Sequence, residues 1–320
     1  MNEQDIIRRI AARGTRTRRD VVLGIGDDAA LIRAPAGHEL VVSTDSLVAG
    51  IHFPVNTSPA AIGHKALAVN LSDIAAMGAE PAWFTLNLAL PEADAEWLER
   101  FCDGLFALAD EFGVVLIGGD TDRAPLAAGV QIIGFAPPGK ALRRSSAHTG
   151  DSIFVTGTLG DAMLGLEIAR GSLSVPEVCR AALLARFEYP TPRVAVGVGL
   201  RGLASACVDI SDGLARDLGH MLEASGVGAT LSGERLPYSD CFRRAAPPHA
   251  LARALNHGDD YELVFTVPAT RGAEVARLAA RTGCPITEIG RIEAAPGLRI
   301  RAADGAIATH ACVGHDHFAR

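Results

Sequence analysis

Cysteine occurs in this chain, but never at the spacing that metal sites or disulfide scaffolds use. The six cysteines of the 320 residues lie far apart, and no CxxC pair is present. Zinc-binding proteins and small disulfide-rich proteins both depend on closely spaced cysteines, so neither class is supported. We expect reduced, buried thiols that act as small hydrophobic side chains.

Lysine and long apolar runs are also scarce. Lys65 and Lys140 are the only lysines, the net charge is −7, and neither half of the chain is basic, which argues against nucleic-acid binding. The apolar runs are broken by Gly, Pro or charged residues, so none reaches the roughly 18 residues of a membrane helix. The start of the chain has no apolar signal-peptide segment. We therefore expect a cytoplasmic protein with no membrane partner.

Common catalytic signatures are absent as well. The chain has no GxSxG, no HExxH and no Cys–His pairing signature, and "GIGDD" at 24–28 is not followed by the GK[ST] of a Walker A loop. The glycine-rich "GTLGDA" at 157–162 matches no nucleotide fingerprint. The tail contains His310, His315 and His317, which leaves open either a metal-binding tract or a packed or solvated tail.

Strand-like and helix-like segments alternate along both halves, which predicts an α/β (α+β) fold with two layers in each domain. A segment rich in Pro, Gly, Ser and Arg separates the halves, so we expect domains at 1–137 and 151–320 joined by a linker at 138–150. The predicted strands are 38–45, 82–90, 114–120, 127–136, 152–157, 206–210, 261–269, 286–292 and 298–305. The predicted helices are 58–79, 94–113, 160–170, 192–204, 211–225 and 270–282.

Acidic residues recur where these apolar elements end. They occur in "GDD" (26–28), "STD" (43–45), "LSD" (71–73), "GGDTD" (118–122), "DISD" (209–212) and "GDDYE" (258–262). Any one of them is typical of a helix cap or a turn. Together they suggest carboxylates that repel one another unless a cation intervenes, and Mg²⁺ with phosphate is the natural occupant. Asp73 lies inside an apolar helical run, where an unpaired charge would be costly; pairing with an Arg or capping is one explanation, but a metal-ligand role explains its position better.

These motifs, in this order, resemble the thiamine-monophosphate kinase family. The resemblance covers residues 21–318 and rests on "GIGDDAAL", "STDSLVAGIHF", "HKALAVNLSDIAAMGAEP", "LIGGDT", "VTGTLGD", "DISDGLARDLGH" and "GDDYELVFT". It implies the two-domain fold of the wider aminoimidazole ribonucleotide synthetase superfamily, with the N-terminal sheet pairing across a homodimer. It also implies phosphorylation of thiamine monophosphate by ATP with several Mg²⁺ ions. No general base emerges from the motifs, and we expect none to be required, because the attacking oxygen of a phosphate monoester is already an anion above the second phosphate pKa of about 6.

The resemblance assigns roles to particular residues. The implied metal ligands are Asp28, Ser43, Thr44, Asp45, Asp73, Asp120, Asp209 and Asp212. The implied ATP-binding residues are Gly119, Asp120, Arg144 and Ser211, and the implied substrate-binding residues are His52, Asp259 and His315. Two positions depart from the family pattern, because Asp259 stands where Glu is frequent and His315 stands where Tyr or Trp usually precedes "DHF". Asp27 is expected to support its turn, and Asp122 has no assigned role.

Two other functions remain open at this point. One is another ATP-dependent enzyme of the same superfamily, although a selenophosphate-type enzyme would need a Cys and a Lys near the N-terminus, and neither occurs before Lys65. The other is a non-catalytic protein that binds divalent cations or nucleotides. Formation of ADP from ATP, Mg²⁺ and thiamine monophosphate distinguishes a kinase from a binding protein.

Overall fold

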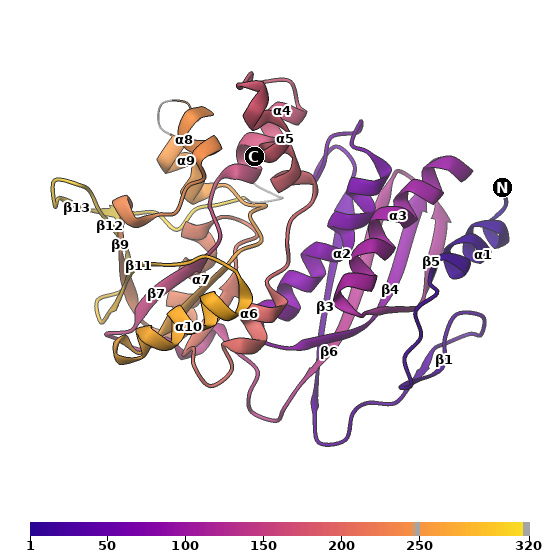
Figure 1. Cartoon of the computed structure of the whole chain (residues 1–320), viewed down its shortest axis with the longest axis horizontal. Coiled ribbons are helices and arrows are strands. Elements are labelled where there is room, and N and C mark those ends of the chain that lie inside the picture. The colour runs from indigo at the N-terminus through magenta and orange to yellow at the C-terminus, as the bar shows by residue number, and fades with distance from the viewer. Residues whose placement is uncertain (246, 248–249, 316–320) are drawn as a thin grey trace. The chain divides into compact units, whose positions relative to one another are not determined.

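The structure is a computed structural model that describes residues 1–245, 247 and 250–315 (Figure 1). The chain divides into two compact units, which we call unit 1 (Met1–Ile74 and Ala79–Gly139) and unit 2 (Ala75–Gly78 and Lys140–Arg320). Both combine helices with sheets, which confirms the predicted α/β (α+β) class. Within the described residues, no helix has the length and apolar character needed to cross a membrane.

Unit 1 is built on a four-stranded sheet in the order β3–β6–β4–β5. Its elements are α1 (Glu3–Arg13), β1 (Val21–Leu23), β2 (Leu31–Ile32), β3 (Glu39–Val48), α2 (Pro59–Ala76), β4 (Glu80–Leu90), α3 (Ala95–Phe112), β5 (Val115–Arg123) and β6 (Ala127–Ala136). The pairing of β4 with β5 is parallel because α3 crosses between them, whereas β6 is antiparallel to both β3 and β4.

Two apolar helices give unit 1 its core. Figure 1 shows α2 and α3 lying along one side of the sheet. Leu67 and Leu71 of α2 and Phe101 of α3 are fully buried, as are Trp83 and Phe84 of β4. Asp94 caps α3 by accepting hydrogen bonds from the N–H groups of the first turn, and Gly113 ends the helix in the left-handed conformation. The local signals therefore agree with the packing.

Unit 2 contains a seven-stranded mixed sheet in the order β13–β12–β9–β11–β7–β10–β8. Its strands are β7 (Ser152–Thr156), β8 (Ala206–Asp209), β9 (Gly228–Ser232), β10 (Leu263–Val267), β11 (Ile286–Glu293), β12 (Gly297–Arg301) and β13 (Ile307–His310). Its α-helices are α4 (Asp161–Ala169), α5 (Glu177–Glu188), α6 (Val194–Gly199), α7 (Leu214–Ser225), α8 (Asp240–Ala245), α9 (Ala250–Asn256) and α10 (Gly272–Thr282). The short 3₁₀ turns are η1 (Arg144–Ser146), η2 (Gly233–Arg235) and η3 (Ala269–Arg271).

The cysteines require a correction. Cys179 of α5 and Cys241 of α8 form a disulfide, with their Cα atoms 5.2 Å apart, so the expectation of six reduced thiols is wrong for this pair. The two residues are 62 positions apart in sequence, and only the packing of α5 against α8 brings them together. Cys102, Cys207 and Cys284 are free and buried, as expected, whereas Cys312 is free and exposed.

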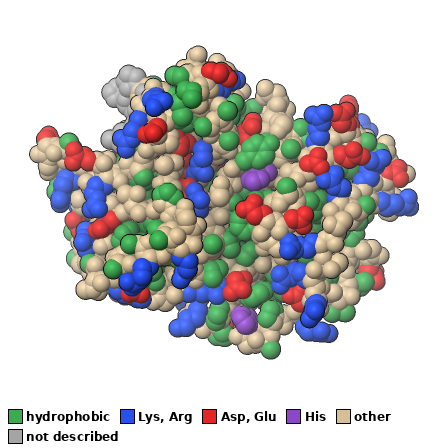
Figure 2. Space-filling model, in the orientation of Figure 1, with side chains coloured by type: hydrophobic (Ala, Val, Ile, Leu, Met, Phe, Trp, Pro, Cys, Tyr) green, Lys and Arg blue, Asp and Glu red, His purple; other side chains and the backbone are tan. Residues whose placement is uncertain are grey.

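Charged side chains are mixed on the surface. On the face drawn in Figure 2, Lys and Arg side chains lie among Asp and Glu side chains. Much of the pairing is local, such as Arg100 with Glu96 on α3 and Arg271 with Glu274 at the start of α10. Pairs of this exposed kind contribute little to stability, so the core and the buried polar groups described below must hold the fold.

Candidate active site

The edge strand β3 and helix α2 bring three of the predicted metal ligands of unit 1 together. The Ser43 hydroxyl donates a hydrogen bond to Asp73 Oδ2 at 2.5 Å, and the Asp45 N–H donates to Asn70 Oδ1 at 3.1 Å. Side chains alternate along a strand, so Ser43 and Asp45 share one face of β3. Asp73 is therefore paired with a hydroxyl that a cation could share, rather than with an arginine.

Thr44 points the other way. Its hydroxyl donates to the Val130 carbonyl at 3.1 Å, and it lies between Ser43 and Asp45 on the opposite face of β3. Any contribution of Thr44 to a cation on the Asp73 side must therefore come from its main chain.

Gly119 and Asp120 lie across the sheet from β3. Asp45 pairs with Val130, which pairs with Leu86, which pairs with Gly119. Three strand spacings separate the Asp45 and Gly119 backbones by about 14 Å. A small cavity of about 80 Å³ adjoins these residues, lined by Ile7, Ile10, Ile25, Leu86, Leu116, Gly118, Gly119, Asp120 and Thr121. Within unit 1, Asp120 is thus not a neighbour of Asp45 and would form a separate part of the proposed site.

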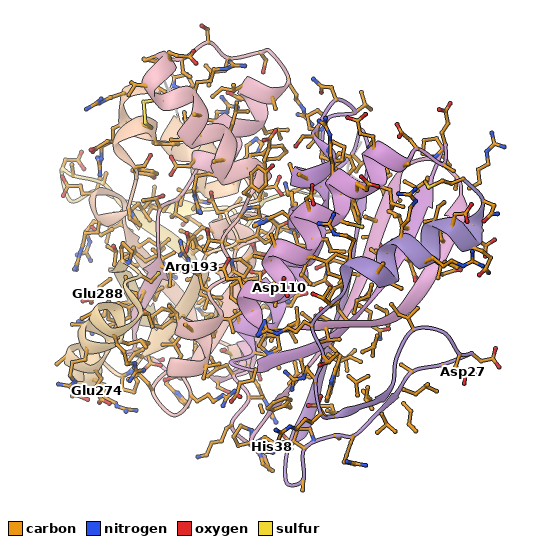
Figure 3. All side chains as sticks on the ribbon, turned by 45° about the vertical axis from the view of Figure 1, so that its right-hand side comes forward. Asp27, His38, Asp110, Arg193, Glu274 and Glu288 are labelled. Atoms are coloured by element: carbon orange, nitrogen blue, oxygen red, sulfur yellow. A yellow bond between two sulfur atoms is a disulfide. The ribbon has the colours of Figure 1, made fainter. Side chains whose placement is uncertain are left out.

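Asp28 and His52 are held by local hydrogen bonds. The Asp28 N–H donates to Asp27 Oδ1 at 2.8 Å, in agreement with a turn-supporting role for Asp27. Figure 3 shows Asp27 at the outer end of the β1–β2 segment, and Asp28 beside it is exposed. The Val48 N–H donates to His52 Nδ1 at 2.9 Å, which helps to orient the imidazole ring.

In unit 2, Asp209 is the last residue of β8, and Ser211 and Asp212 lie in the turn between β8 and α7. Asp217 Oδ2 accepts the N–H groups of Ser211, Asp212 and Gly213 at 2.9, 2.9 and 3.1 Å. Burial raises the pKa of Asp217 to about 7, while these N–H donors act in the opposite direction. Asp217 was missed from the sequence, although an acidic residue in the first turn of a helix is a recognisable signal.

The "GDDYE" segment is joined to this turn through the main chain. The Asp259 N–H donates to the Ser211 carbonyl at 2.9 Å, and the Tyr261 N–H donates to the Ile210 carbonyl at 2.9 Å. Asp259 and Tyr261 have φ values of 69° and 48°, which are uncommon for residues other than glycine. The surrounding structure must compensate for this backbone strain.

The tail adds His315 to the same end of α7. The His315 N–H donates to the Asp212 carbonyl at 3.0 Å, and the Arg216 guanidinium donates to the His315 carbonyl. Burial lowers the pKa of the nearby His257, Arg253 lowers it further, and Asp259 and His315 are both close enough to influence it. Asp212, Asp259 and His315 are therefore gathered in one region, whereas His317 lies outside the described residues.

Arg144 is placed differently from the other predicted residues of unit 2. Its carbonyl accepts the Ser225 hydroxyl at 2.8 Å, at the C-terminal end of α7. Asp212 precedes the N-terminal end of the same helix, and a helix of this length spans about 18 Å. The Arg144 backbone is thus distant from the Asp212 turn, and its contact with ATP stays a prediction.

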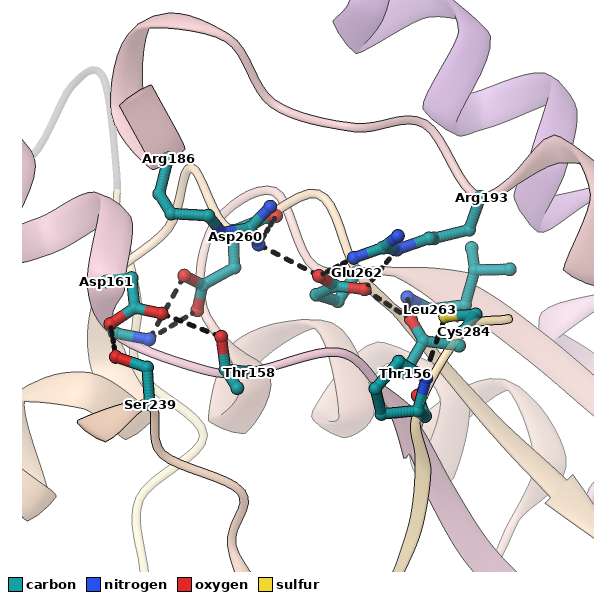
Figure 4. Close-up of polar contacts among 12 residues, drawn as sticks. Thr156, Thr158, Asp161, Arg186, Arg193, Ser239, Asp260, Glu262, Leu263 and Cys284 are labelled. Atoms are coloured by element: carbon teal, nitrogen blue, oxygen red, sulfur yellow. Dashed lines mark hydrogen bonds and ion pairs between the residues drawn. The ribbon is translucent and has the colours of Figure 1, made fainter. Parts of the chain in front are cut away.

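Just after Asp259 in sequence, the buried carboxylates Asp260 and Glu262 belong to a set of charges that sequence reasoning did not find and that includes two partly buried arginines (Figure 4). We call Arg186, Arg193, Asp260 and Glu262 the buried frame. Glu262 has no exposed surface and accepts two hydrogen bonds of 2.6 Å from Arg193, one of 2.8 Å from Arg186 and one of 2.6 Å from the Thr156 hydroxyl. Both carboxylate oxygens of Asp260 lie 3.0 Å from the Gly160 N–H.

The donor chemistry of the predicted set suits Mg²⁺, because it consists of carboxylate, hydroxyl and main-chain oxygens. In the described part of the chain, however, no group of three or more His, Cys, Asp or Glu side chains is arranged to hold a metal ion. Ser43, Asp45 and Asp73 form the best candidate in unit 1, and the Asp209–Asp212 turn forms the best candidate in unit 2.

Comparison with known proteins places the chain in a family. The model for the N-terminal domain of AIR synthase related proteins matches residues 26–136, and the model for their C-terminal domain matches residues 148–303. The thiamine-monophosphate kinase of Salmonella typhimurium is 48% identical over 320 residues, which is 99% of this chain and 98% of that protein. The chain therefore belongs to the AIR synthase related proteins and, among them, to the thiamine-monophosphate kinase family.

Solved structures agree with this placement. The crystal structure of thiamine-monophosphate kinase from Stenotrophomonas maltophilia K279a has a TM-score of 0.87 and 47% identity, covering 95% of this chain and 96% of that one. A second structure, described as AaThiL complexed with AMPPCP and TMP, has a TM-score of 0.78 and 31% identity, covering 98% of this chain and 96% of that one. The two-domain architecture implied by the sequence motifs is thereby confirmed.

Proposed function

We propose that this protein transfers the γ-phosphoryl group of ATP to thiamine monophosphate, giving thiamine diphosphate and ADP. The observation that carries this proposal is the 48% identity to a thiamine-monophosphate kinase along almost the whole of both chains. The similar structure described with AMPPCP and TMP supports the same pair of substrates. A non-catalytic binding protein and another ATP-dependent enzyme of the superfamily have no comparable support.

Several Mg²⁺ ions would be held by the recurring acids. In unit 1 the proposed ligands are Asp28, Ser43, Thr44 through its main chain, Asp45, Asp73 and Asp120, and in unit 2 they are Asp209 and Asp212. The chemistry that bound Mg²⁺ supplies is neutralisation of the repulsion between two phosphate chains. Gly119, Asp120, Arg144 and Ser211 would bind ATP, and His52, Asp259 and His315 would bind thiamine monophosphate.

The reaction needs alignment more than proton transfer. The attacking atom is an oxygen of a phosphate monoester, which is already an anion above the second phosphate pKa of about 6. A kinase that acts on an alcohol usually positions a carboxylate to accept the hydroxyl proton. Here the main-chain bonds of Ser211 and Asp259 and the ring placement of His52 would orient the substrates, and no general base is required.

The exposed face of β3 supports the proposal of a homodimer. Leu40 and Val42 are 48% and 54% exposed, and Thr44 continues the same row on the side away from Asp73. An apolar row of this kind on a sheet suits a second copy of the chain, so we propose that the N-terminal sheets pair across a dimer. We also propose a cytoplasmic location, where ATP is available.

The test is an assay with two acceptors. We expect ADP formation with ATP, Mg²⁺ and thiamine monophosphate, and none above background with free thiamine at the same concentration. Measured across pH 5–9, kcat/KM should fall on the acid side near the second pKa of the substrate phosphate, about 6. Absence of ADP with thiamine monophosphate would contradict the kinase proposal and favour a non-catalytic binding protein. Equal turnover of free thiamine would mean that the protein contains a general base.

A further inference from the structure

The residues of the "GDDYE" segment alternate between two environments. Asp260 and Glu262 are 1% and 0% exposed, whereas Asp259 and Tyr261 are only partly buried. The segment therefore has an inner side that enters the buried frame and an outer side that carries the proposed substrate contact Asp259. Figure 4 shows the inner side, where Arg186 and Arg193 converge on Glu262.

The inner side also explains the glycine-rich "GTLGDA" segment, to which the sequence assigned no function. A Cβ at Gly157 would lie 2.0 Å from Glu262 Oε1, and a Cβ at Gly160 would lie 2.6 Å from the Phe242 ring. Gly160 precedes α4, has no side-chain cap, and gives its N–H to Asp260 instead. The loop is thus shaped around two carboxylates that lie about 100 residues further along the chain.

We propose that the buried frame positions Asp259 for its contact with thiamine monophosphate, so that Arg186, Arg193, Asp260 and Glu262 are positioning residues. This inference rests on the proposed function. Two hydrogen bonds from the Arg193 guanidinium hold Glu262, an arrangement that we call the Arg193 fork, and the Gly160 N–H before α4 holds Asp260. Asp259 lies directly before them in sequence, in a left-handed conformation. A shift of Glu262 therefore moves Asp259 relative to Ser211 and His315.

A conservative change in the fork tests this role. Arg193→Lys keeps the positive charge but loses the two-point geometry, because an ammonium group cannot make the paired bonds of a guanidinium. We expect KM for thiamine monophosphate to rise by about 10-fold to 100-fold, while KM for ATP changes little. A purely structural role would lower thermal stability without this selective change in KM.

The chain offers a matched control. Arg271 makes the same two-point contact with Glu274, with both bonds at 2.7 Å, but these side chains are 35% and 38% exposed and lie outside the buried frame. Figure 3 shows Glu274 and Arg193 in different parts of unit 2. Arg271→Lys should leave both KM values unchanged. An equal effect of the two Arg→Lys changes would overturn the proposal.

A double-mutant cycle separates this inference from the proposed function. If wild type forms no ADP, or if Asp259→Asn leaves KM for thiamine monophosphate unchanged, the proposed function or its substrate contact fails. If Asp259→Asn raises that KM, adding Arg193→Lys should raise it little further, because both changes act through Asp259. Multiplicative effects would overturn the inference.

A second variant covers the case in which Arg193→Lys does not fold. Thr156→Val removes the hydroxyl that donates to Glu262 and accepts the Leu263 N–H, while both arginines remain. It should raise KM for thiamine monophosphate selectively, by about 10-fold. Unchanged KM in a folded Thr156→Val protein would also count against the positioning role.

Discussion

The proposed site residues of unit 1 and unit 2 are supported in different ways. In unit 1, Asp28 and Asp120 are exposed, and the hydrogen bonds described for them involve an adjacent residue. In unit 2, Asp212 and Asp259 belong to two segments that main-chain hydrogen bonds join. Asp217 accepts a hydrogen bond from the Asp212 N–H, and the residues that follow Asp259 belong to the buried frame. The turn that carries the acids of unit 2 is held by hydrogen bonds between segments, whereas in unit 1 Asp28 lies in a local turn and the Asp120 side chain is exposed on β5.

The difference shows which site residues the protein itself holds in place and which would be held in place only by a bound ligand. A group that is already fixed loses little conformational freedom when a ligand binds. On the proposed function, unit 2 would supply a preformed part of the site, and the exposed acids of unit 1 would lose their conformational freedom only when cations and phosphates bind. The Ser43–Asp73 bond is the exception, since it links a strand to a helix without any ligand.

The largest effect is expected when the ion pairs of Glu262 in unit 2 are removed. Glu262→Gln leaves two arginines without a carboxylate in a buried setting, which should lower the free energy of unfolding by about 3–5 kcal/mol. Denaturant titration measures this, and Glu274→Gln is the exposed control, for which we expect no measurable change. A Glu262→Gln protein as stable as wild type would show that the buried frame does not hold unit 2 together.

Next in size is the loss of charge at the proposed ligands. Asp45→Asn in unit 1 and Asp209→Asn in unit 2 should each lower kcat by about 100-fold or more, because stabilisation of charge dominates phosphoryl transfer. Circular dichroism should remain that of the wild type. Asp122→Asn, at an exposed position on β5, is the control that should keep normal kcat. Near-normal kcat in either ligand variant would remove that residue from the site.

Mg²⁺ alone should give a smaller, thermodynamic effect. A ligand that binds only the folded state adds RT ln(1 + [L]/Kd), about 1.4 kcal/mol at ten times Kd. Melting with EDTA and with Mg²⁺ should show a higher Tm with the ion, and Asp45→Asn should reduce the difference. Identical melting curves would argue against a clustered metal site in the folded protein.

The smallest effect concerns Asp20, a carboxylate of unit 1 outside the proposed site. Hydrogen bonds from Arg18 and Trp83 lower the pKa of Asp20 below its ordinary value of 3.8. A lowered pKa gives stability that is present above pH 3.8 and is lost as the pH falls through the folded value. Asp20→Asn should cost about 1 kcal/mol or less at pH 7 and nothing in strong acid.

Sequence patterns predicted the elements best where local signals and packing agree. The strand expected at 127–136 coincides with β6, and the helix expected at 94–113 is α3 with its Asp94 cap and terminal Gly113. The helix expected at 192–204 is present only as α6, Val194–Gly199. The helix α5 was missed because few of its residues are buried, so its apolar periodicity is weak.

The candidate site was predictable as motifs but not as contacts. The acids are recognisable in the sequence because they belong to short motifs. The structure places Ser211 and Asp212 of "DISD" beside Asp259 of "GDDYE", in agreement with these motifs. The pairing of Ser43 with Asp73 and of Glu262 with Arg193 joins residues 30 and 69 positions apart, which no local pattern specifies. The Cys179–Cys241 disulfide was missed for the same reason.

The strand order of unit 2 also affects folding during protein synthesis, because β7 is synthesised well before the strands that pair with it. The interior strand β7 is completely buried in the folded protein, yet its neighbours β10 and β11 come later, with Thr156 and Leu263 separated by 107 residues. At about 5–20 residues per second on the ribosome, β7 waits for about 5–20 s before β10 emerges. Unit 1 has all four strands of its main sheet by residue 136. We therefore expect nascent chains that end between β7 and β10 to be the ones that recruit chaperones.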